Sequence, residues 1–201
     1  PQGEFEAQLV SWVECGEEPE ADRVEPKLQF VRPDRSTLPP LSRYATLREV
    51  DGRVLRVGAT MASRGCKHTC KHCPVVPVYQ GQFRLIAPSI VLQDIAQLVS
   101  AGAQHITFSD PDFFNAPRHA LEVANQLHKQ FPSISYDATI KVEHLLKHAE
   151  LIPTLKGTGC RFITTAVESL DDAVLARLDK GHTRAEFLSV VEDTRRHEIA
   201  L

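Results

Sequence analysis

PSIVLQDIAQLVSAGAQHITF, residues 88–108, is the stretch that decides the fold of this chain. Its first part repeats apolar residues at helical spacing, which predicts a helix over Ser89–Ser100 that stops at Gly102. The run that follows, Gln104–Phe108, is short, apolar and typical of a buried strand. A helix that leads directly into a strand is part of a βαβ unit.

The same alternation continues along the rest of the chain. Strands are expected over Ile134–Ile140 and Cys160–Val167, and another begins at Ile199. The helices expected between and after them are Pro117–Gln130, Val142–Lys156 with an interruption at Pro153, Asp171–Leu178 and Arg184–His197. Strands separated by helices imply right-handed connections and a parallel sheet. We therefore expect an α/β fold of about four βα units and the start of a fifth, either a (β/α) barrel or a doubly wound sheet.

A hairpin precedes these units. Thr46–Val50 and Arg53–Val57 read as its arms, because Asp51-Gly52 is a strong two-residue turn signal. The second arm leads towards a cysteine-rich run, and Pro74–Phe83, which contains two prolines and a glycine, reads as a loop.

The N-terminal part has a different composition. Residues 4–15 place apolar side chains at helical spacing, and residues 16–40 are rich in proline and charge, as in an extended linker. We therefore expect two parts, a helix and linker over 1–40 and a core domain over 41–201. The first residue is not Met and the last residues resemble the start of a strand, so we expect a C-terminally truncated core from a longer protein.

Composition limits the function classes. The 201 residues are 42% hydrophobic and 24% charged, with a net charge of −3, so no general nucleic-acid-binding surface is indicated. No apolar run has the length of a membrane span, and no signal peptide is visible. The five cysteines are an odd number, so structural disulfides are not expected and a reducing cytoplasm is the expected location.

The residues that point most directly to chemistry are Cys66, Cys70 and Cys73, spaced C-x3-C-x2-C after the apolar stretch Val54–Ala59. Three thiolates can hold an iron–sulfur cluster, but they leave one iron without a protein ligand. A reaction could therefore take place at the iron that has no protein ligand.

Two other interpretations use the same residues. Zinc accepts sulfur and imidazole, so the three cysteines with His68 or His72 predict a structural or interaction module as the alternative function. An electron carrier needs a fourth cysteine ligand, and neither Cys15 nor Cys160 is near in sequence.

The cysteine run resembles the signature of the radical S-adenosylmethionine (SAM) superfamily. The resemblance implies a 4Fe-4S cluster on Cys66, Cys70 and Cys73 whose open iron binds SAM. It also implies reductive cleavage of SAM to a 5′-deoxyadenosyl radical, which activates a substrate. A partial (β/α) TIM-type barrel and a reductant of flavodoxin or ferredoxin type are implied as well.

The resemblance covers roughly residues 55–201 and is greatest to radical SAM proteins that carry an N-terminal cobalamin-binding domain. Residues 1–40 then resemble the tail of that domain, so cobalamin would come from a domain outside this chain. Methyl transfer, methylthiolation and hydrogen abstraction all remain open, and the sequence does not name the substrate.

Functional groups of parallel α/β folds gather beyond the carboxyl ends of the strands. At those places the resemblance implies SAM contacts for five residues. His72 would lie against the adenine, Lys141 would face the SAM carboxylate or the substrate, and Glu168 and Ser169 would contact the ribose or methionine part. Asp110 would position SAM in place of the glycine-rich run of many members.

Structural interpretations stand beside these roles. Asp110 and its neighbour Asp112 are also typical of turn or cap carboxylates, and Lys141 of an exposed lysine. Lys180 and Thr183 are expected to shape a helix junction, and Cys160 to be an inert buried thiol. The cationic residues around the cysteines are expected to lower the thiol pKa values.

Overall fold

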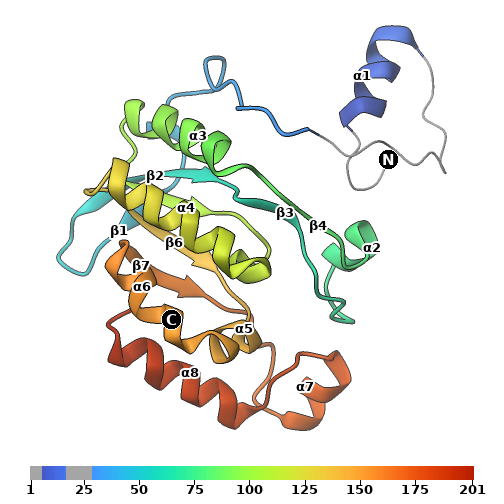
Figure 1. Cartoon of the computed structure of the whole chain (residues 1–201), viewed down its shortest axis with the longest axis vertical. Helices are drawn as coiled ribbons and strands as arrows, with labels where there is room; N and C mark the ends of the chain where they lie inside the picture. The colour runs from blue at the N-terminus through green and yellow to red at the C-terminus, as the bar shows by residue number, and fades with distance from the viewer. Residues whose placement is uncertain (1–5, 17–28) are drawn as a thin grey trace.

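The computed structural model describes residues 6–16 and 29–201 (Figure 1). Seven strands form two sheets in this part of the chain. The strands are β1 Thr46–Arg48, β2 Val54–Thr60, β3 Ser63–Gly65, β4 Phe83–Leu85, β5 His105–Phe108, β6 Ser135–Thr139 and β7 Cys160–Thr164. The α-helices are α1 Glu6–Cys15, α2 Val75–Tyr79, α3 Pro88–Ser100, α4 Pro117–Gln130, α5 Val142–Lys147, α6 Ile152–Gly157, α7 Asp172–Leu178 and α8 Arg184–Arg196. Three short 3-10 helices are η1 Leu41–Arg43, η2 Phe113–Asn115 and η3 Ala149–Leu151.

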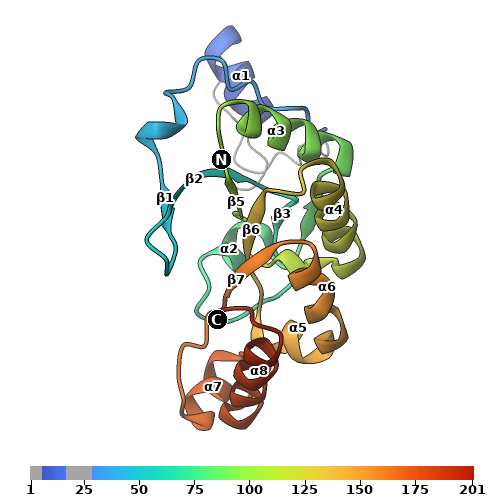
Figure 2. The same cartoon turned by 90° about the vertical axis from the view of Figure 1, so that its left-hand side faces the viewer.

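The main sheet has the order β1-β2-β5-β6-β7. β1 pairs with β2 in the antiparallel sense, and the other neighbours are parallel. A further parallel bridge joins Phe162 of β7 to Ala200. The parallel strands therefore follow one another in sequence order, and the helices α3, α4 and α6 lie along the same side of the sheet (Figures 1 and 2). This is the partial (β/α) barrel, and not the doubly wound sheet, whose helices cover both faces.

The core lies between the sheet and these helices. The predicted helix around residue 90 is α3, and its apolar stripe is buried against β2. Gly58 of β2 permits this close approach, because a Cβ there would lie 3.0 Å from Leu98 Cδ1. Residues 88–108 thus form the predicted helix, α3, and the predicted strand, β5.

The ends of the later helices follow their local chemistry. The Thr183 hydroxyl accepts from the N–H of Glu186 and the Glu186 carboxylate accepts from the N–H of Thr183, a capping box that begins α8. Asp171 accepts from two backbone N–H groups at the start of α7. The predicted role of Thr183 at a helix junction is confirmed.

Three local predictions were wrong. Pro74–Phe83 is not a loop throughout, because it forms α2 and leads into β4, which pairs with β3. The helix expected over Val142–Lys156 breaks at His148, and Pro153 lies in the first turn of α6, where its missing N–H costs nothing. The strand expected to reach Val167 ends at Thr164.

The N-terminal helix is present from Glu6 to Cys15, and most of the expected linker, 17–28, lies outside the described residues. The segment that follows is fixed to the barrel by Arg35, whose guanidinium contacts both oxygens of Asp94 at 2.6 and 2.8 Å. Within the described ranges, no helix is long and apolar enough to cross a membrane.

Candidate active site

The cysteine loop, residues 66–74, starts directly after β3 and ends at α2. Gly65 makes this turn possible, because its φ is +83° and a Cβ would lie 2.5 Å from the Gln82 carbonyl oxygen. Cys66, Cys70 and Cys73 are free thiols, and the N–H of Cys73 donates to the carbonyl of Cys70. The short strand β3 lies between β2 and the loop, and the sequence did not predict this strand.

The three cysteines line one pocket of about 210 Å³ beyond the carboxyl ends of the parallel strands. His72, Lys141 and Glu168, predicted on three different loops, line the same pocket. The other lining residues are His68, Pro74, Pro111, Asp112, Thr139, Ile140, Ala166 and Lys180. The structure thus brings together six of the eight predicted site residues.

Glu168 has a strained backbone and a paired carboxylate. Its φ is +69°, a left-handed conformation that is uncommon for residues other than glycine. Its Oε1 lies 3.1 Å from His72 Nε2 and 3.7 Å from Lys180 Nζ. Lys180 is therefore part of the pocket wall. The sequence predicted only a helix-junction role for Lys180, because Lys180 follows α7 and not one of the strands whose ends lie at the pocket.

Asp110 lies away from this pocket. Its carboxylate accepts from the Ala62 N–H at 2.9 Å and the Ser63 hydroxyl at 2.5 Å, and it is 2% exposed. Burial raises the pKa of Asp110, although these hydrogen bonds partly offset the effect. Asp110 therefore braces β5 against the segment before the cysteine loop, and its contact with SAM stays a prediction that this position does not favour.

Ser169 also lies outside the set of pocket-lining residues. Its hydroxyl accepts from the N–H of Asp171 at 3.0 Å, so it supports the turn into α7. Its predicted contact with SAM is not favoured by this position.

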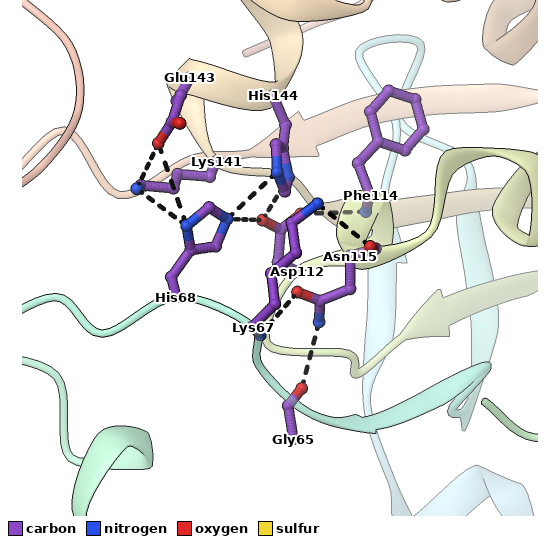
Figure 3. Close-up of polar contacts among 9 residues, drawn as sticks. All are labelled: Gly65, Lys67, His68, Asp112, Phe114, Asn115, Lys141, Glu143 and His144. Atoms are coloured by element: carbon purple, nitrogen blue, oxygen red, sulfur yellow. Dashed lines mark hydrogen bonds and ion pairs between the residues drawn. The ribbon is translucent and has the colours of Figure 1, made fainter. Parts of the chain in front are cut away.

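Asp112, two residues after Asp110, faces the pocket instead. It belongs to the His-Asp-His cluster, which we define as His68, Asp112 and His144 (Figure 3). Burial would raise the pKa of Asp112, but the neighbouring imidazoles outweigh it and hold that pKa below its usual value. His144 was missed from the sequence, although its place in the first turn after β6 was a signal.

Asn115 holds the start of the cysteine loop in place. Its Oδ1 accepts from the Lys67 N–H at 3.1 Å, and its Nδ2 donates to the Gly65 carbonyl at 3.2 Å (Figure 3). These two backbone groups flank Cys66. The loop after β5 therefore fixes the first predicted metal ligand through Asn115.

The expectation that cationic neighbours lower the thiol pKa values fails at Cys66. Burial raises the pKa of this thiol, and the Asp112 carboxylate adds to the effect, against a lowering by the His68 N–H. The cationic neighbours are directed elsewhere: the Arg64 guanidinium pairs with Glu6, and the Lys67 ammonium donates to the Asn115 carbonyl.

The donor set can be tested against a metal centre. Zinc, bound at about 2.3 Å, would draw thiolates to within roughly 3.8 Å of one another. Among the described residues, the one group of potential ligands whose atoms all lie within 4.8 Å is the His-Asp-His cluster, not the cysteines. Three free thiols around one pocket fit a cluster that has three cysteine ligands and one open iron.

A parallel half-barrel with three free cysteines in one pocket beyond its strand ends is the arrangement of a barrel protein that could hold a metal centre there. The family model described as the radical SAM superfamily matches residues 61–200. The chain therefore belongs to the radical SAM superfamily, and the predicted family is confirmed. Membership implies an enzyme that uses a 4Fe-4S cluster and SAM.

Relatives with known activities span several reactions. The chain is 24% identical over 87% of its length to bacteriochlorophyllide d C-12(1)-methyltransferase of Chlorobaculum tepidum. It is 29% identical over 78% of its length to tRNA-2-methylthio-N(6)-dimethylallyladenosine synthase of Chlorobium luteolum. The matched region spans 39% and 36% of these two proteins.

Solved structures share the fold. The cobalamin-dependent radical SAM enzyme OxsB, with aqua-cobalamin and SAM bound, matches 78% of this chain and 28% of its own with a TM-score of 0.63 and 16% identity. The radical SAM methyltransferase TsrM from Kitasatospora setae matches 71% of this chain and 29% of its own with a TM-score of 0.58 and 17% identity.

Proposed function

We propose that this chain is the catalytic core of a radical SAM enzyme in which Cys66, Cys70 and Cys73 ligate the 4Fe-4S cluster. The observation that carries the proposal is that these three free thiols line one pocket with Glu168, His72 and Lys141. A cluster bound there supplies the electron that cleaves SAM. The chain itself supplies ligands, orientation and a partly enclosed place for the reaction.

The polar wall of the pocket suits the charges of SAM. Glu168 and Lys141 come from the ends of β7 and β6, so they can receive a cationic amino group and a carboxylate from different sides. Lys180 and His72 orient the Glu168 carboxylate, because both lie within 4 Å of it. Thus Glu168 is the residue on which we expect SAM affinity to depend most.

The reaction after SAM cleavage is proposed from the relatives. Methyl or methylthio transfer is the class that their names support. OxsB and TsrM have been described with cobalamin bound, so a cobalamin-binding domain beyond this chain, reached through residues 1–40, is part of the proposal. An electron donor of flavodoxin or ferredoxin type and a reducing cytoplasm complete it, because the proposed ligands must remain reduced thiols.

The test is anaerobic purification and reconstitution of the chain with iron and sulfide. We expect about four irons and four sulfides per chain, and 5′-deoxyadenosine when SAM and dithionite are added. Cys70→Ala should abolish both. Stoichiometric zinc without sulfide, or a cluster retained by Cys70→Ala, would contradict the proposal.

A second arm measures SAM binding to the reconstituted chain. Glu168→Gln keeps the side-chain length and the strained backbone but removes the charge. We expect SAM to bind about tenfold more weakly, the effect of losing one charged hydrogen bond. Glu150→Gln, on the exposed 3-10 helix η3, is the matched control and should leave affinity unchanged.

A further inference from the structure

The His-Asp-His cluster brings donors from three separate segments to one point. His68 comes from the cysteine loop, Asp112 from the loop after β5, and His144 from α5 (Figure 3). His68 Nε2 lies 3.2 Å from His144 Nε2 and 3.5 Å from Asp112 Oδ2. His144 Nδ1 lies 2.7 Å from the same Asp112 oxygen. Two imidazoles and one carboxylate thus place their ligand atoms within 4.8 Å of one another, close enough for one ion to contact all three.

The cluster is buried and incompletely hydrogen-bonded. The side chains of Asp112 and His144 are 2% and 3% exposed, and that of His68 is 15% exposed. Asp112 Oδ1 accepts from the Phe114 N–H, but Asp112 Oδ2 and His144 Nδ1 have no hydrogen-bond partner. Although these two atoms are close, they are not aligned for a hydrogen bond. Buried polar atoms without hydrogen bonds are rare, and an ion held between Asp112 Oδ2 and His144 Nδ1 would satisfy both.

We propose that His68, Asp112 and His144 form a mononuclear site for a divalent first-row transition metal, separate from the cysteine site. Ligand atoms bound at about 2.1 Å lie roughly 3.0 to 3.4 Å apart in octahedral and tetrahedral sites. With His144 binding through Nδ1, the distances from the shared Asp112 Oδ2, 2.7 Å to His144 Nδ1 and 3.5 Å to His68 Nε2, bracket this range. Two imidazoles with one carboxylate suit zinc or iron(II) and leave open positions facing the pocket.

The surrounding charges permit a dication. Asp112 and Glu143 are anionic and Lys141 is cationic, so the group has a net charge of −1 when both histidines are neutral. The Lys141 ammonium donates to Glu143 Oε2 at 2.7 Å and lies 3.3 Å from His68 Nδ1. That Glu143 oxygen is also 4.0 Å from His68 Nδ1. The Lys141 ammonium can only donate, so metal binding through Nε2 requires His68 to carry its proton on Nδ1 and to turn that N–H from Lys141 towards the Glu143 carboxylate.

The first experiment separates this site from the cysteine site. In a chain with Cys66→Ala, Cys70→Ala and Cys73→Ala, no cluster can form, so any bound ion belongs to the second site. After equilibration with Zn²⁺ and exhaustive dialysis, we expect about one zinc per chain by elemental analysis. Co²⁺ should give the visible absorption bands of nitrogen and oxygen ligation.

Asp112→Asn and His144→Ala, added to that chain, should each weaken Zn²⁺ binding at least tenfold, as loss of a ligand does. His148→Ala, one turn further along and outside the cluster, is the matched control and should bind normally. The wild-type chain reconstituted with iron and sulfide should bind one zinc beyond its four irons, and Asp112→Asn should lose only the zinc.

Absence of zinc from the cysteine-free chain would overturn the proposal and leave a hydrogen-bonded His-Asp-His network. Equal binding by Asp112→Asn and the control would overturn it as well. Circular dichroism of each variant identifies one that has failed to fold, and Asp112→Asn, which is nearly isosteric, then carries the comparison. Loss of the cluster without loss of the zinc would count against the proposed function alone.

Discussion

Two aspartates two residues apart in sequence have different tasks in this protein. Asp110 braces the backbone at Ala62 and the hydroxyl of Ser63, whereas Asp112 faces the pocket with two histidines. The sequence placed both in one loop and favoured Asp110 for SAM. The path of the segment before the cysteine loop decides which carboxylate contacts the backbone and which faces the pocket. No pattern in the sequence predicts that path.

Asp110→Asn should make stability less dependent on pH. Burial raises the pKa of Asp110 above its unfolded value of 3.8, so the folded chain binds this proton more tightly. Its contribution to the free energy of unfolding is therefore complete below that pH and is lost as pH rises through the folded pKa. Each unit of the rise corresponds to about 1.4 kcal/mol. Urea unfolding at several pH values between 4 and 7 measures the free energy of unfolding of the wild type and of Asp110→Asn.

The variant should gain stability relative to wild type across that interval as the pH rises. Asp34→Asn is the control, because hydrogen bonds from Ser36 lower the pKa of that exposed carboxylate. Its difference from wild type should change little between pH 4 and 7, because a lowered pKa places that dependence below pH 4. Parallel curves for wild type and Asp110→Asn would show that burial does not perturb Asp110.

At the scale of elements, the cysteine loop depends on the loop after β5. Asn115 contacts the backbone on both sides of Cys66. Asn115→Ala leaves the Lys67 N–H and the Gly65 carbonyl without these partners, so we expect the free energy of unfolding to fall by about 2 kcal/mol. The amide of Lys67 should also exchange its hydrogen faster.

Asn115→Asp is the harsher variant, because it keeps an acceptor for Lys67 but turns a carboxylate oxygen towards the Gly65 carbonyl at a buried position. It should lower the free energy of unfolding at least as much as Asn115→Ala. Gln126→Ala removes an exposed side-chain hydrogen bond to Glu122 on α4 and should change little. If Asn115→Ala lowers the free energy of unfolding no more than Gln126→Ala does, Asn115 does not hold the cysteine loop in place.

Elements differ in how well their sequences predict them. α3, α4 and α8 have long apolar stripes or clear caps, and each was predicted to within about two residues. α2 and β4 were missed because they have only five and three residues, and α2 also contains a proline. Their conformation is imposed by β3 and Gly65, so tertiary contacts outweigh their weak local preferences.

At the scale of the whole molecule, the segment before β1 is attached to the barrel through a buried charge. Asp94 is 3% exposed and accepts from both Arg35 and the Thr60 hydroxyl. Arg35→Ala leaves this carboxylate with Thr60 alone. We expect a loss of about 2 kcal/mol in the free energy of unfolding, below the full cost for a buried pair because Arg35 is partly exposed.

Arg196→Ala removes an arginine whose ion pair with Asp193 lies on the surface of α8, and it should have little measurable effect. Chemical unfolding of both variants makes the comparison. Adding Asp94→Asn to Arg35→Ala should recover part of the loss, because no unpaired charge then remains buried. Equal effects of the two arginine variants would show that Arg35 is not an anchor.

The sequence by itself determined the parallel βα units and the superfamily. Periodicity of apolar residues and the spacing of Cys66, Cys70 and Cys73 are local properties, and they persist whatever the rest of the chain does. It also located Glu168, His72 and Lys141, because strand ends of a parallel sheet meet at one edge.

Only the tertiary structure decided how these loops meet. It turned Asp110 and Ser169 away from the pocket, brought Lys180 into it, and joined His144 to His68 and Asp112. The contacts of Asp110 and of the His-Asp-His cluster join side chains that are 32 to 76 residues apart in sequence. Such contacts depend on the packing of whole elements, which no short pattern of residues contains.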